Sequence, residues 1–182
     1  MTTLVVVSHS DPDSLTHHVA QSVSDAIRAA GDTVETADLA AENFDPRFSS
    51  ADLNLFRGNG TTPVDVLAEQ ERIDRADHLV LVFPMYWWSM PALLKGWIDR
   101  VFVSGWAHDI TADSGVVKKL DRLTVHLIPI AGDDADSFEI VSVPADSPVV
   151  ALLTLSGLMM KADWVMPGAT DPAPAKGSEE KK

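Results

Sequence analysis

The sequence predicts a single α/β domain in which an open, five-stranded parallel sheet in the order 2-1-3-4-5 carries helices on both faces. Three observations support this prediction. Short apolar runs alternate with segments of helical spacing, which is the order that βαβ units produce. These runs are apolar on both faces, as in strands that helices cover from both sides. The 182 residues, 46% of them hydrophobic, suffice for one full core and are too few for two comfortable domains.

The first strand and the first helix have clear signals. Thr3 to Val7 (TLVVV) is β-branched and apolar throughout, which predicts a buried strand. A helix is predicted from Leu15 to Ala30 because its apolar residues recur at intervals of three and four. That apolar face consists of Val19, Val23, Ile27 and Ala30. Gly31 ends the helix as a C-cap, and Thr33 to Leu39 (TVETADL) is predicted to form the second strand.

The middle of the chain begins with a long connection. Ala41 to Thr62 contains prolines and an Asn-Gly turn signal, so it is predicted to be a loop with one short helix. Helical spacing returns from Val64 to Ala76. The apolar run from His78 to Phe83 (HLVLVF) then predicts the third strand.

The remaining elements are predicted from weaker patterns toward the C-terminus. Pro91 to Val103 is predicted to be a helix with its proline in the first turn, where a missing N–H has no consequence. Leu123 to Ile130 is predicted to be the fourth strand. A helix over Val149 to Met160 and a short fifth strand over Trp164 to Met166 complete the prediction, with residues 1–168 forming the domain. Residues 169–182 are proline-rich and charged, which predicts a disordered tail.

Composition narrows the classes of function. The chain has 14 Lys and Arg against 27 Asp and Glu, a net charge of -13, which argues against nucleic-acid binding. The absence of cysteine excludes disulfides and thiolate metal sites and is compatible with a reducing cytosol. No apolar run approaches the roughly 20 residues that a membrane span needs, and the N-terminus lacks the basic segment of a signal peptide. We therefore expect a cytoplasmic protein with no membrane span and no metal site.

The topology predicts where a ligand binds. In open parallel sheets, ligands bind outside the carboxyl ends of the strands, where the strand order reverses. For the flavodoxin-like order 2-1-3-4-5 this point lies between the first and third strands. Two segments should therefore form the site: SHSDPDSLTH (8–17) after the first strand, and PMYWWSM (84–90) after the third.

The segment after the first strand has the chemistry of an anion site. Unpaired amides at a helix start and the helix dipole favour an anion, and Ser10, Ser14 and Thr16 add hydroxyl donors. His9 offers an imidazole N–H. In the alternative reading, the polar side chains of this loop only cap the helix. The neighbouring residues His17 and His18 are expected to be ordinary helix-surface residues.

The segment after the third strand places Tyr86, Trp87 and Trp88 at the predicted ligand edge. Such a loop offers a planar apolar wall with backbone amides beside it, which suits a flat heteroaromatic ring such as isoalloxazine. The alternative is that these rings fill the core or a dimer interface. Their position directly after a strand end favours the ligand reading.

Four segments of the chain resemble one family. The stretch VFPMYWWSMPALLKGWIDRVFVSGWAH (82–108) resembles the flavodoxin-like NAD(P)H:quinone oxidoreductases, a group that includes DT-diaphorase, the modulator of drug activity B type and the ancillary subunits of glutathione-gated potassium efflux systems. LVVVSHSDPDSLTHHVA, TADLAAENFDPRFSSADL and LIPIAGDDADSF are similar to other segments of the same family, in the same order. The resemblance extends from Thr3 to Phe138.

The resemblance implies roles for individual residues. The loop that holds the flavin phosphate is matched by His9, Ser14, Leu15 and Thr16. The loop against which the isoalloxazine lies is matched by Pro84, Met85, Tyr86, Trp87 and Trp88. The loop at the other edge of the ring is matched by Ile130, Ala131 and Gly132. Trp106 matches an aromatic residue of the substrate pocket, usually across a dimer interface, and Phe138 lies where many members carry a tyrosine proton donor.

The implied activity is two-electron hydride transfer from NADPH or NADH, through bound FMN or FAD, to a quinone, in a cytoplasmic homodimer. No catalytic side chain is assigned, because Phe138 cannot donate a proton and no histidine follows His126. One alternative is a flavin-binding regulatory subunit of a membrane potassium antiporter. Another is a degenerate member with weak activity or without flavin.

Overall fold

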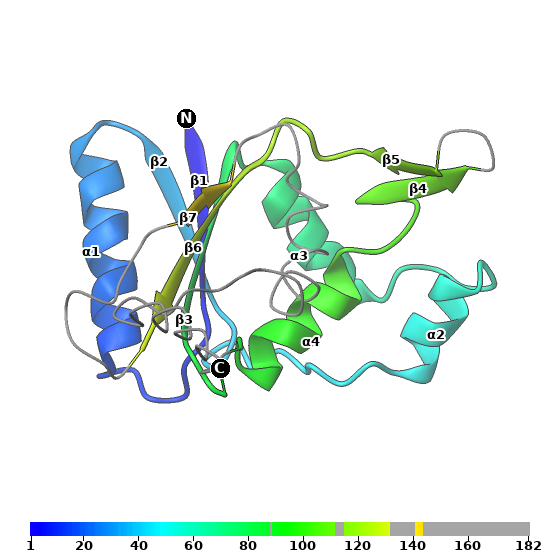
Figure 1. Cartoon of the computed structure of the whole chain (residues 1–182), viewed down its shortest axis with the longest axis horizontal. Coiled ribbons are helices and arrows are strands. Elements are labelled where there is room, and N and C mark those ends of the chain that lie inside the picture. The colour runs from blue at the N-terminus through cyan, green and yellow to red at the C-terminus, as the bar shows by residue number, and fades with distance from the viewer. Residues whose placement is uncertain (88, 112–114, 132–140, 144–182) are drawn as a thin grey trace, which may run out of the picture.

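The computed structural model describes residues 1–87, 89–111, 115–131 and 141–143. Its main sheet consists of β1 (Thr2–Val7), β2 (Thr33–Asp38), β3 (His78–Pro84), β6 (Thr124–Ile130) and β7 (Val141–Val143). The strands lie in the order β2-β1-β3-β6-β7, and the first four of that order are parallel (Figure 1). This confirms the predicted 2-1-3-4 arrangement, with β6 as the fourth strand.

The edge of the sheet beyond β6 is formed by β7, which pairs antiparallel with it. The predicted helix over Val149 to Met160, the predicted strand over Trp164 to Met166 and the predicted tail from Ala169 lie outside the described residues. The boundary of the domain at residue 168 therefore stays a prediction.

Helices lie on both faces of the sheet. They are α1 (Leu15–Ala29), α2 (Ser50–Phe56), α3 (Val64–Asp74) and α4 (Ala92–Val101). Figure 1 shows α1 on one side of the sheet and α3 with α4 on the other, while the short α2 lies at the far end of the molecule. Each helix falls where a helical pattern was predicted. The proline before α4 is its N-cap rather than part of its first turn.

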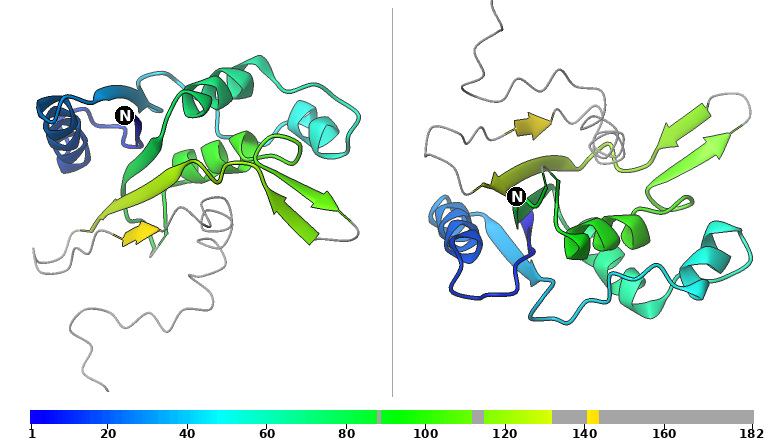
Figure 2. Two further views of the ribbon diagram at one scale, coloured as in Figure 1. Left: turned by 90° about the horizontal axis from the view of Figure 1, so that it is seen from above. Right: turned by 60° about the horizontal axis from the view of Figure 1, so that its bottom comes forward.

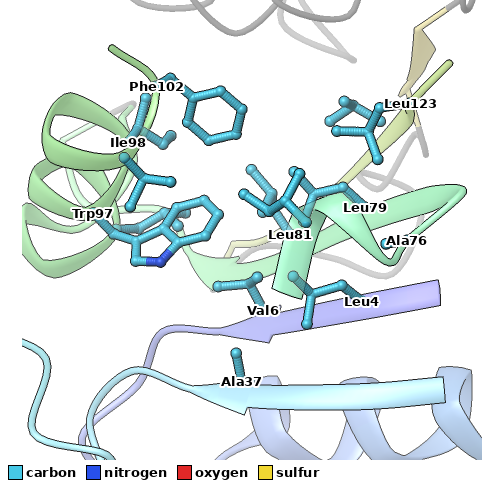
Figure 3. Close-up of a cluster of buried hydrophobic side chains, with 14 of the residues drawn as sticks. Leu4, Val6, Ala37, Ala76, Leu79, Leu81, Trp97, Ile98, Phe102 and Leu123 are labelled. Atoms are coloured by element: carbon cyan, nitrogen blue, oxygen red, sulfur yellow. The ribbon is translucent and has the colours of Figure 1, made fainter. Parts of the chain in front are cut away.

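The sheet separates two apolar layers because successive strand residues point to opposite faces. On one face, Val5, Val7, Val80 and Val82 pack with Ala20 of α1. On the other, Leu4, Val6, Leu79 and Leu81 pack against α3 and α4, with the buried Trp97 at the centre (Figure 3). The strands β1 and β3 are buried on both faces, as their continuous apolar runs predicted, whereas β2 and β6 are only partly buried.

The ends of α1 follow standard capping chemistry. Ser14 has extended backbone angles, and its side chain accepts a hydrogen bond from the His17 N–H. At the other end, the amides of Gly31 and Asp32 donate to the carbonyls of Arg28 and Ile27, and Gly31 has a φ of +88°. Gly31 therefore terminates the helix as predicted. The prediction that Ala30 continues the apolar face of the helix was wrong, because Ala30 is the exposed C-cap residue.

A small hairpin between α4 and β6 was not predicted. It consists of β4 (His108–Thr111) and β5 (Gly115–Lys118), which pair antiparallel as a separate two-stranded sheet. Figure 2 shows the hairpin projecting away from the main sheet. Its strands are too short for the alternation of apolar and polar residues to give a clear signal.

The connection between β2 and α3 is fixed to α4 by one arginine. The Arg100 guanidinium donates to Asp52 (Nε to Oδ1, 3.1 Å), to Asp65 (Nη1 to Oδ2, 2.6 Å) and to the Asp45 carbonyl (2.7 Å). Burial raises the pKa of Asp52, but hydrogen bonds from Ser49 and Arg100 outweigh burial and lower it. The predicted loop is therefore tied to the helix that follows the aromatic segment.

Candidate functional site

The sheet brings three of the predicted loops to one edge. Val7 pairs with both Asp38 and Val82, and Pro84 pairs with Ile130, so the carboxyl ends of these parallel strands lie side by side. The Met85 N–H donates to the Ile130 carbonyl at 2.8 Å, which links the third-strand and fourth-strand loops. This edge is the lower end of the sheet in Figure 1.

The loop from β1 to α1 is held by its own hydrogen bonds. Asp11 accepts from the Asp13 N–H through its side chain (3.0 Å) and from the Ser14 N–H through its carbonyl (3.2 Å). His9 Nδ1 lies 3.0 Å from the Asp11 amide nitrogen and 3.2 Å from its carbonyl oxygen, so this ring nitrogen is engaged by the loop backbone. A ligand at this edge would therefore meet Nε2 of His9.

The residues that open α1 differ in exposure. Thr16 is buried and Ser14 is half-buried, whereas the Leu15 side chain is 61% exposed. The amides of a first helical turn have no partner within the helix and carry the positive end of its dipole. Polar donors and an exposed apolar side chain thus lie together at the helix start.

A chain of three side chains at this point was not predicted. Ser14 Oγ lies 3.0 Å from His17 Nδ1, and His17 Nε2 lies 2.8 Å from Asp38 Oδ2. The expectation that His17 is an ordinary surface residue was therefore wrong, because its side chain is only 17% exposed and joins α1 to the end of β2. His18 is exposed as expected, and its Nδ1 lies 3.0 Å from the Ser14 carbonyl oxygen.

The aromatic segment after β3 forms a tight turn. The Tyr86 N–H donates to the Ser89 carbonyl at 2.8 Å, and the Ser89 N–H donates back to the Tyr86 carbonyl at 3.0 Å. Within this turn Trp87 has a φ of +51°, in the left-handed region that side-chain-bearing residues rarely adopt. Trp88 is outside the described residues.

The Tyr86 and Trp87 rings are exposed. The Trp87 side chain is 89% exposed and the Tyr86 side chain is 53% exposed, so neither ring is filler for the core of its own chain. A large aromatic residue held in strained backbone and exposed to solvent is an outlier that suggests a binding role. A flat ligand and a second protein subunit are the two partners that fit this feature.

Two further parts of the predicted site lie apart. Ile130 and Ala131 are half-buried at the carboxyl edge, while Gly132 and Phe138 are outside the described residues. Trp106 Nε1 donates to Asp74 at the end of α3, 3.2 Å away. The end of α3 leads into the start of β3, so Trp106 lies toward the amino edge of the sheet. One chain alone therefore does not bring Trp106 to the other predicted residues.

The residues at the carboxyl edge fit a flavin nucleotide in two respects. Hydroxyls and helix amides at the start of α1 are donors suited to a phosphate, and the exposed Trp87 indole at the same edge of the sheet is a surface suited to an aromatic ring. Ser8 adds a buried hydroxyl at the end of β1, and within the described residues its Oγ has no hydrogen-bond partner. A buried hydroxyl without a partner requires an explanation, and a ligand bound at this edge would supply one.

Neither a metal site nor a membrane-spanning helix is found in the part of the chain that the structure describes. No three His, Asp or Glu side chains gather there as the ligands of a metal ion would. Among the described helices, none has both the length and the apolar character that crossing a bilayer requires.

Two curated proteins illustrate the sequence similarity. Ribosyldihydronicotinamide dehydrogenase [quinone] of Pongo abelii is 34% identical over 141 residues, which cover 67% of this chain and 61% of that protein. The glutathione-regulated potassium-efflux system ancillary protein KefF of Enterobacter sp. (strain 638) is 38% identical over 106 residues, which cover 58% of this chain and 57% of that protein. The chain thus spans about three fifths of the length of these two relatives.

Two solved structures illustrate the structural similarity. NAD(P)H:quinone oxidoreductase from Methanothermobacter marburgensis superposes with a TM-score of 0.70 at 25% identity, over 90% of this chain and 78% of that one. General stress protein 14 from Treponema denticola, in complex with FMN, superposes with a TM-score of 0.51 at 27% identity, over 88% of this chain and 79% of that one. A family profile described as flavodoxin-like fold matches residues 1–156. The chain is therefore a member of the flavodoxin-like fold family, among the relatives of the quinone oxidoreductases.

Proposed function

We propose that this protein is a flavin-dependent NAD(P)H:quinone oxidoreductase that transfers two electrons as hydride from a nicotinamide to a quinone. The observation that carries the proposal is the exposed, left-handed Trp87, in a turn at the same carboxyl edge of the sheet as the hydroxyl-rich start of α1. Relatives named as quinone dehydrogenases and quinone oxidoreductases support this substrate class.

The proposed site assigns one role to each loop. The phosphate would be held by His9, Ser14, Leu15 and Thr16. One side and edge of the ring would be met by Pro84, Met85, Tyr86, Trp87 and Trp88. The opposite edge would be met by Ile130, Ala131 and Gly132, and Phe138 would lie near the substrate.

A bound flavin supplies the ring that accepts and returns the hydride. The protein contributes orientation, exclusion of water and hydrogen bonds to developing negative charge. Tyr86 is the single tyrosine of the chain, and its phenol is half exposed at the predicted ring edge. We propose that Tyr86 donates the hydrogen bond that Phe138 cannot supply.

FMN is the flavin that we propose first, because the Treponema denticola structure that this chain resembles contains FMN. FAD is the alternative, and either NADPH or NADH can serve as donor. A cysteine-free chain is compatible with the reducing cytoplasm, where we place the protein.

Steady-state kinetics test the proposal. The flavin-free protein is reconstituted separately with FMN and with FAD, and oxidation of NADH and of NADPH is followed with menadione as acceptor. We expect menadione-dependent oxidation well above the rate of free flavin, and a lower rate in Tyr86→Phe. Protein that binds either flavin but consumes neither donor would contradict the reductase function.

The position of Trp106 supports a homodimer. Within one chain Trp106 is held at the amino edge by Asp74, so it can reach a substrate only in a neighbouring subunit. Light scattering on the purified chain should therefore give twice the monomer mass. A monomer that is fully active would contradict the proposed role of Trp106.

The similarity to a potassium-efflux ancillary protein favours a second candidate function, that of a regulatory subunit of a membrane antiporter. This function predicts that the protein binds vesicles containing such an antiporter and changes its ion flux. Menadione reductase activity without any effect on flux would leave the enzyme as the sole function.

A further inference from the structure

We propose that His17 and Asp38 control the direction of the Ser14 hydroxyl at the start of α1, so that binding of an anionic ligand there is accompanied by uptake of a proton on His17. This inference rests on the proposed function, because the anion is the phosphate of the flavin. It makes His17 a positioning residue, since its ring contacts Ser14 and Asp38 rather than the reacting atoms.

Asp38 fixes which nitrogen of His17 carries a proton. Oδ1 of this carboxylate accepts from the Ala40 amide at 3.2 Å and from the Ala41 amide at 3.1 Å, while Oδ2 faces His17 Nε2 at 2.8 Å. The two oxygens of an aspartate carboxylate can only accept hydrogen bonds. His17 Nε2 must therefore be the donor in this contact.

A neutral imidazole protonated on Nε2 has an unprotonated Nδ1, which can only accept. Ser14 Oγ lies 3.0 Å from this nitrogen, so the hydroxyl donates its proton to His17. The same oxygen accepts from the His17 amide at 3.4 Å. In this arrangement the Ser14 O–H points at the ring, and an arriving phosphate would meet oxygen lone pairs instead of a donor.

Protonation of Nδ1 reverses the contact between the two side chains. The imidazolium then donates from Nδ1 to Ser14 Oγ, and the hydroxyl proton is free to turn toward a phosphate oxygen. The positive charge of His17 is balanced by Asp38 on one side and lies near the incoming anion on the other. Binding of one anion is thus coupled to binding of one proton by His17, and no other covalent bond forms or breaks.

The neighbours of His17 limit which other group could take up the proton. In the described part of the chain, the titratable groups that contact its ring are Asp38 from β2 and His9 from the loop after β1. The His9 ring is edge-on to His17, with centroids 6.3 Å apart. His9 could also gain a proton when an anion binds, so substitutions must separate the two histidines.

Calorimetric titration with FMN at pH 8, in buffers of different ionisation enthalpy, counts the protons taken up on binding. At this pH the phosphate is a dianion, because its second pKa is about 6. We expect uptake approaching one proton in the wild type and at least a three-fold smaller uptake in His17→Gln. The matched control is His18→Gln, which changes the adjacent exposed ring and should retain the wild-type uptake. Asp38→Asn provides a second variant, in which we also expect reduced uptake.

Histidine-selective ¹⁵N NMR of the flavin-free protein tests the geometry independently of any ligand. We expect the His17 proton on Nε2, with Nδ1 becoming protonated when FMN is added. A proton on Nδ1 in the flavin-free protein would overturn the inference. So would unchanged proton uptake in folded His17→Gln or Asp38→Asn, and in that case the flavin-binding function would still stand. Failure of the wild type to bind FMN or FAD would instead overturn the proposed function and the inference with it.

Discussion

Trp87 and Trp97 belong to one continuous segment and have opposite environments. Trp97 is fully buried, donates from Nε1 to Glu69 at 2.8 Å, and meets the Phe102 ring edge-on at 5.6 Å. Trp87 is 89% exposed and has a φ of +51°. Figure 3 shows the Trp97 indole among the side chains of the sheet and α4. One aromatic-rich motif thus places the Trp97 ring in the core and leaves the Trp87 ring on the surface, where we propose that it contacts the flavin.

The largest effect should come from removing the buried ring. Trp97→Ala leaves a cavity beneath α4 and deprives Glu69 of a hydrogen bond, so we expect it to lower the free energy of unfolding by about 3–5 kcal/mol. Urea denaturation followed by circular dichroism measures the change. The control is Trp87→Ala, which should leave the free energy of unfolding nearly unchanged. Equal decreases in the free energy of unfolding of the two variants would contradict the proposal that only the Trp97 ring stabilises the fold.

Gly96 lies directly beside Trp97, where α4 and the Pro46 segment are in contact. A Cβ at this position would clash with the Pro46 carbonyl oxygen. Gly96→Ala should therefore destabilise the protein by about 1–3 kcal/mol, despite the higher helix propensity of alanine. Thermal unfolding would show this as a lower Tm. Asp99→Ala on the exposed side of the same helix serves as the control, with an expected change below about 0.5 kcal/mol.

The exposed ring should matter for binding instead. Trp87→Ala is expected to weaken flavin binding by about 1–3 kcal/mol, since it removes an apolar wall contact. Quenching of flavin fluorescence during titration measures the dissociation constant. Unchanged affinity for the flavin would show that Trp87 does not contact the flavin ring. A contact with a second subunit would then be the alternative role of Trp87.

The backbone strain at Trp87 can be separated from the loss of its side chain. A left-handed conformation costs an L-residue about 1–2 kcal/mol, and glycine avoids this cost at the expense of greater freedom in the unfolded chain. Trp87→Gly should therefore be more stable than Trp87→Ala by up to about 1 kcal/mol in urea denaturation. Greater stability of the alanine variant would mean that the turn relaxes to a negative φ when the indole is absent.

The smallest expected effect is the pH dependence of the free energy of unfolding that a pair of histidines in the sheet produces. His78 and His126 stack with ring centroids 5.4 Å apart, and burial together with the proximity of His78 lowers the pKa of His126 from its ordinary value of 6.5. The unfolded chain thus binds the proton more readily than the folded one. The contribution of neutral His126 to the free energy of unfolding should be fully present above pH 6.5 and should fall as the pH drops below that value. In urea titrations between pH 5.5 and 7.5, the free energy of unfolding of His126→Gln should depend less on pH than that of the wild type. An unchanged pH dependence in this variant would show that other groups cause it.

The elements with strong periodicity could be predicted from the sequence, and so could the edge of the sheet at which the loops meet. The strands β1 and β3 are continuous apolar runs bounded by polar residues, so their positions and parallel pairing could be predicted. The hairpin of β4 and β5 was missed because each strand has four residues. Short strands depend on a neighbouring segment for their hydrogen bonds, and a local pattern does not identify that neighbour.

The candidate site was predicted unevenly for a similar reason. The turn at Trp87 follows its strand directly, so its location could be inferred from local order. The link between His17 and Asp38 joins residues 21 positions apart, and only the pairing of β1 with β2 brings them together. The signal that was available is the spacing of His17 three residues after the N-cap Ser14. The position of Trp106 depends on where α3 ends, which its own neighbours in the chain do not reveal.

The bonds of Arg100 have a consequence for protein engineering. Because this side chain donates to Asp52, Asp65 and the Asp45 carbonyl at once, it anchors both the long connection ahead of α3 and the start of α3 to α4. Inserting an affinity tag or a fluorescent label between Asp45 and Asp52 would disturb two of the contacts that hold α4, the helix after the Trp87 turn. The Arg57–Gly58 corner is the better place for a graft, since Gly58 is exposed, has a φ of +73° and has open space around it.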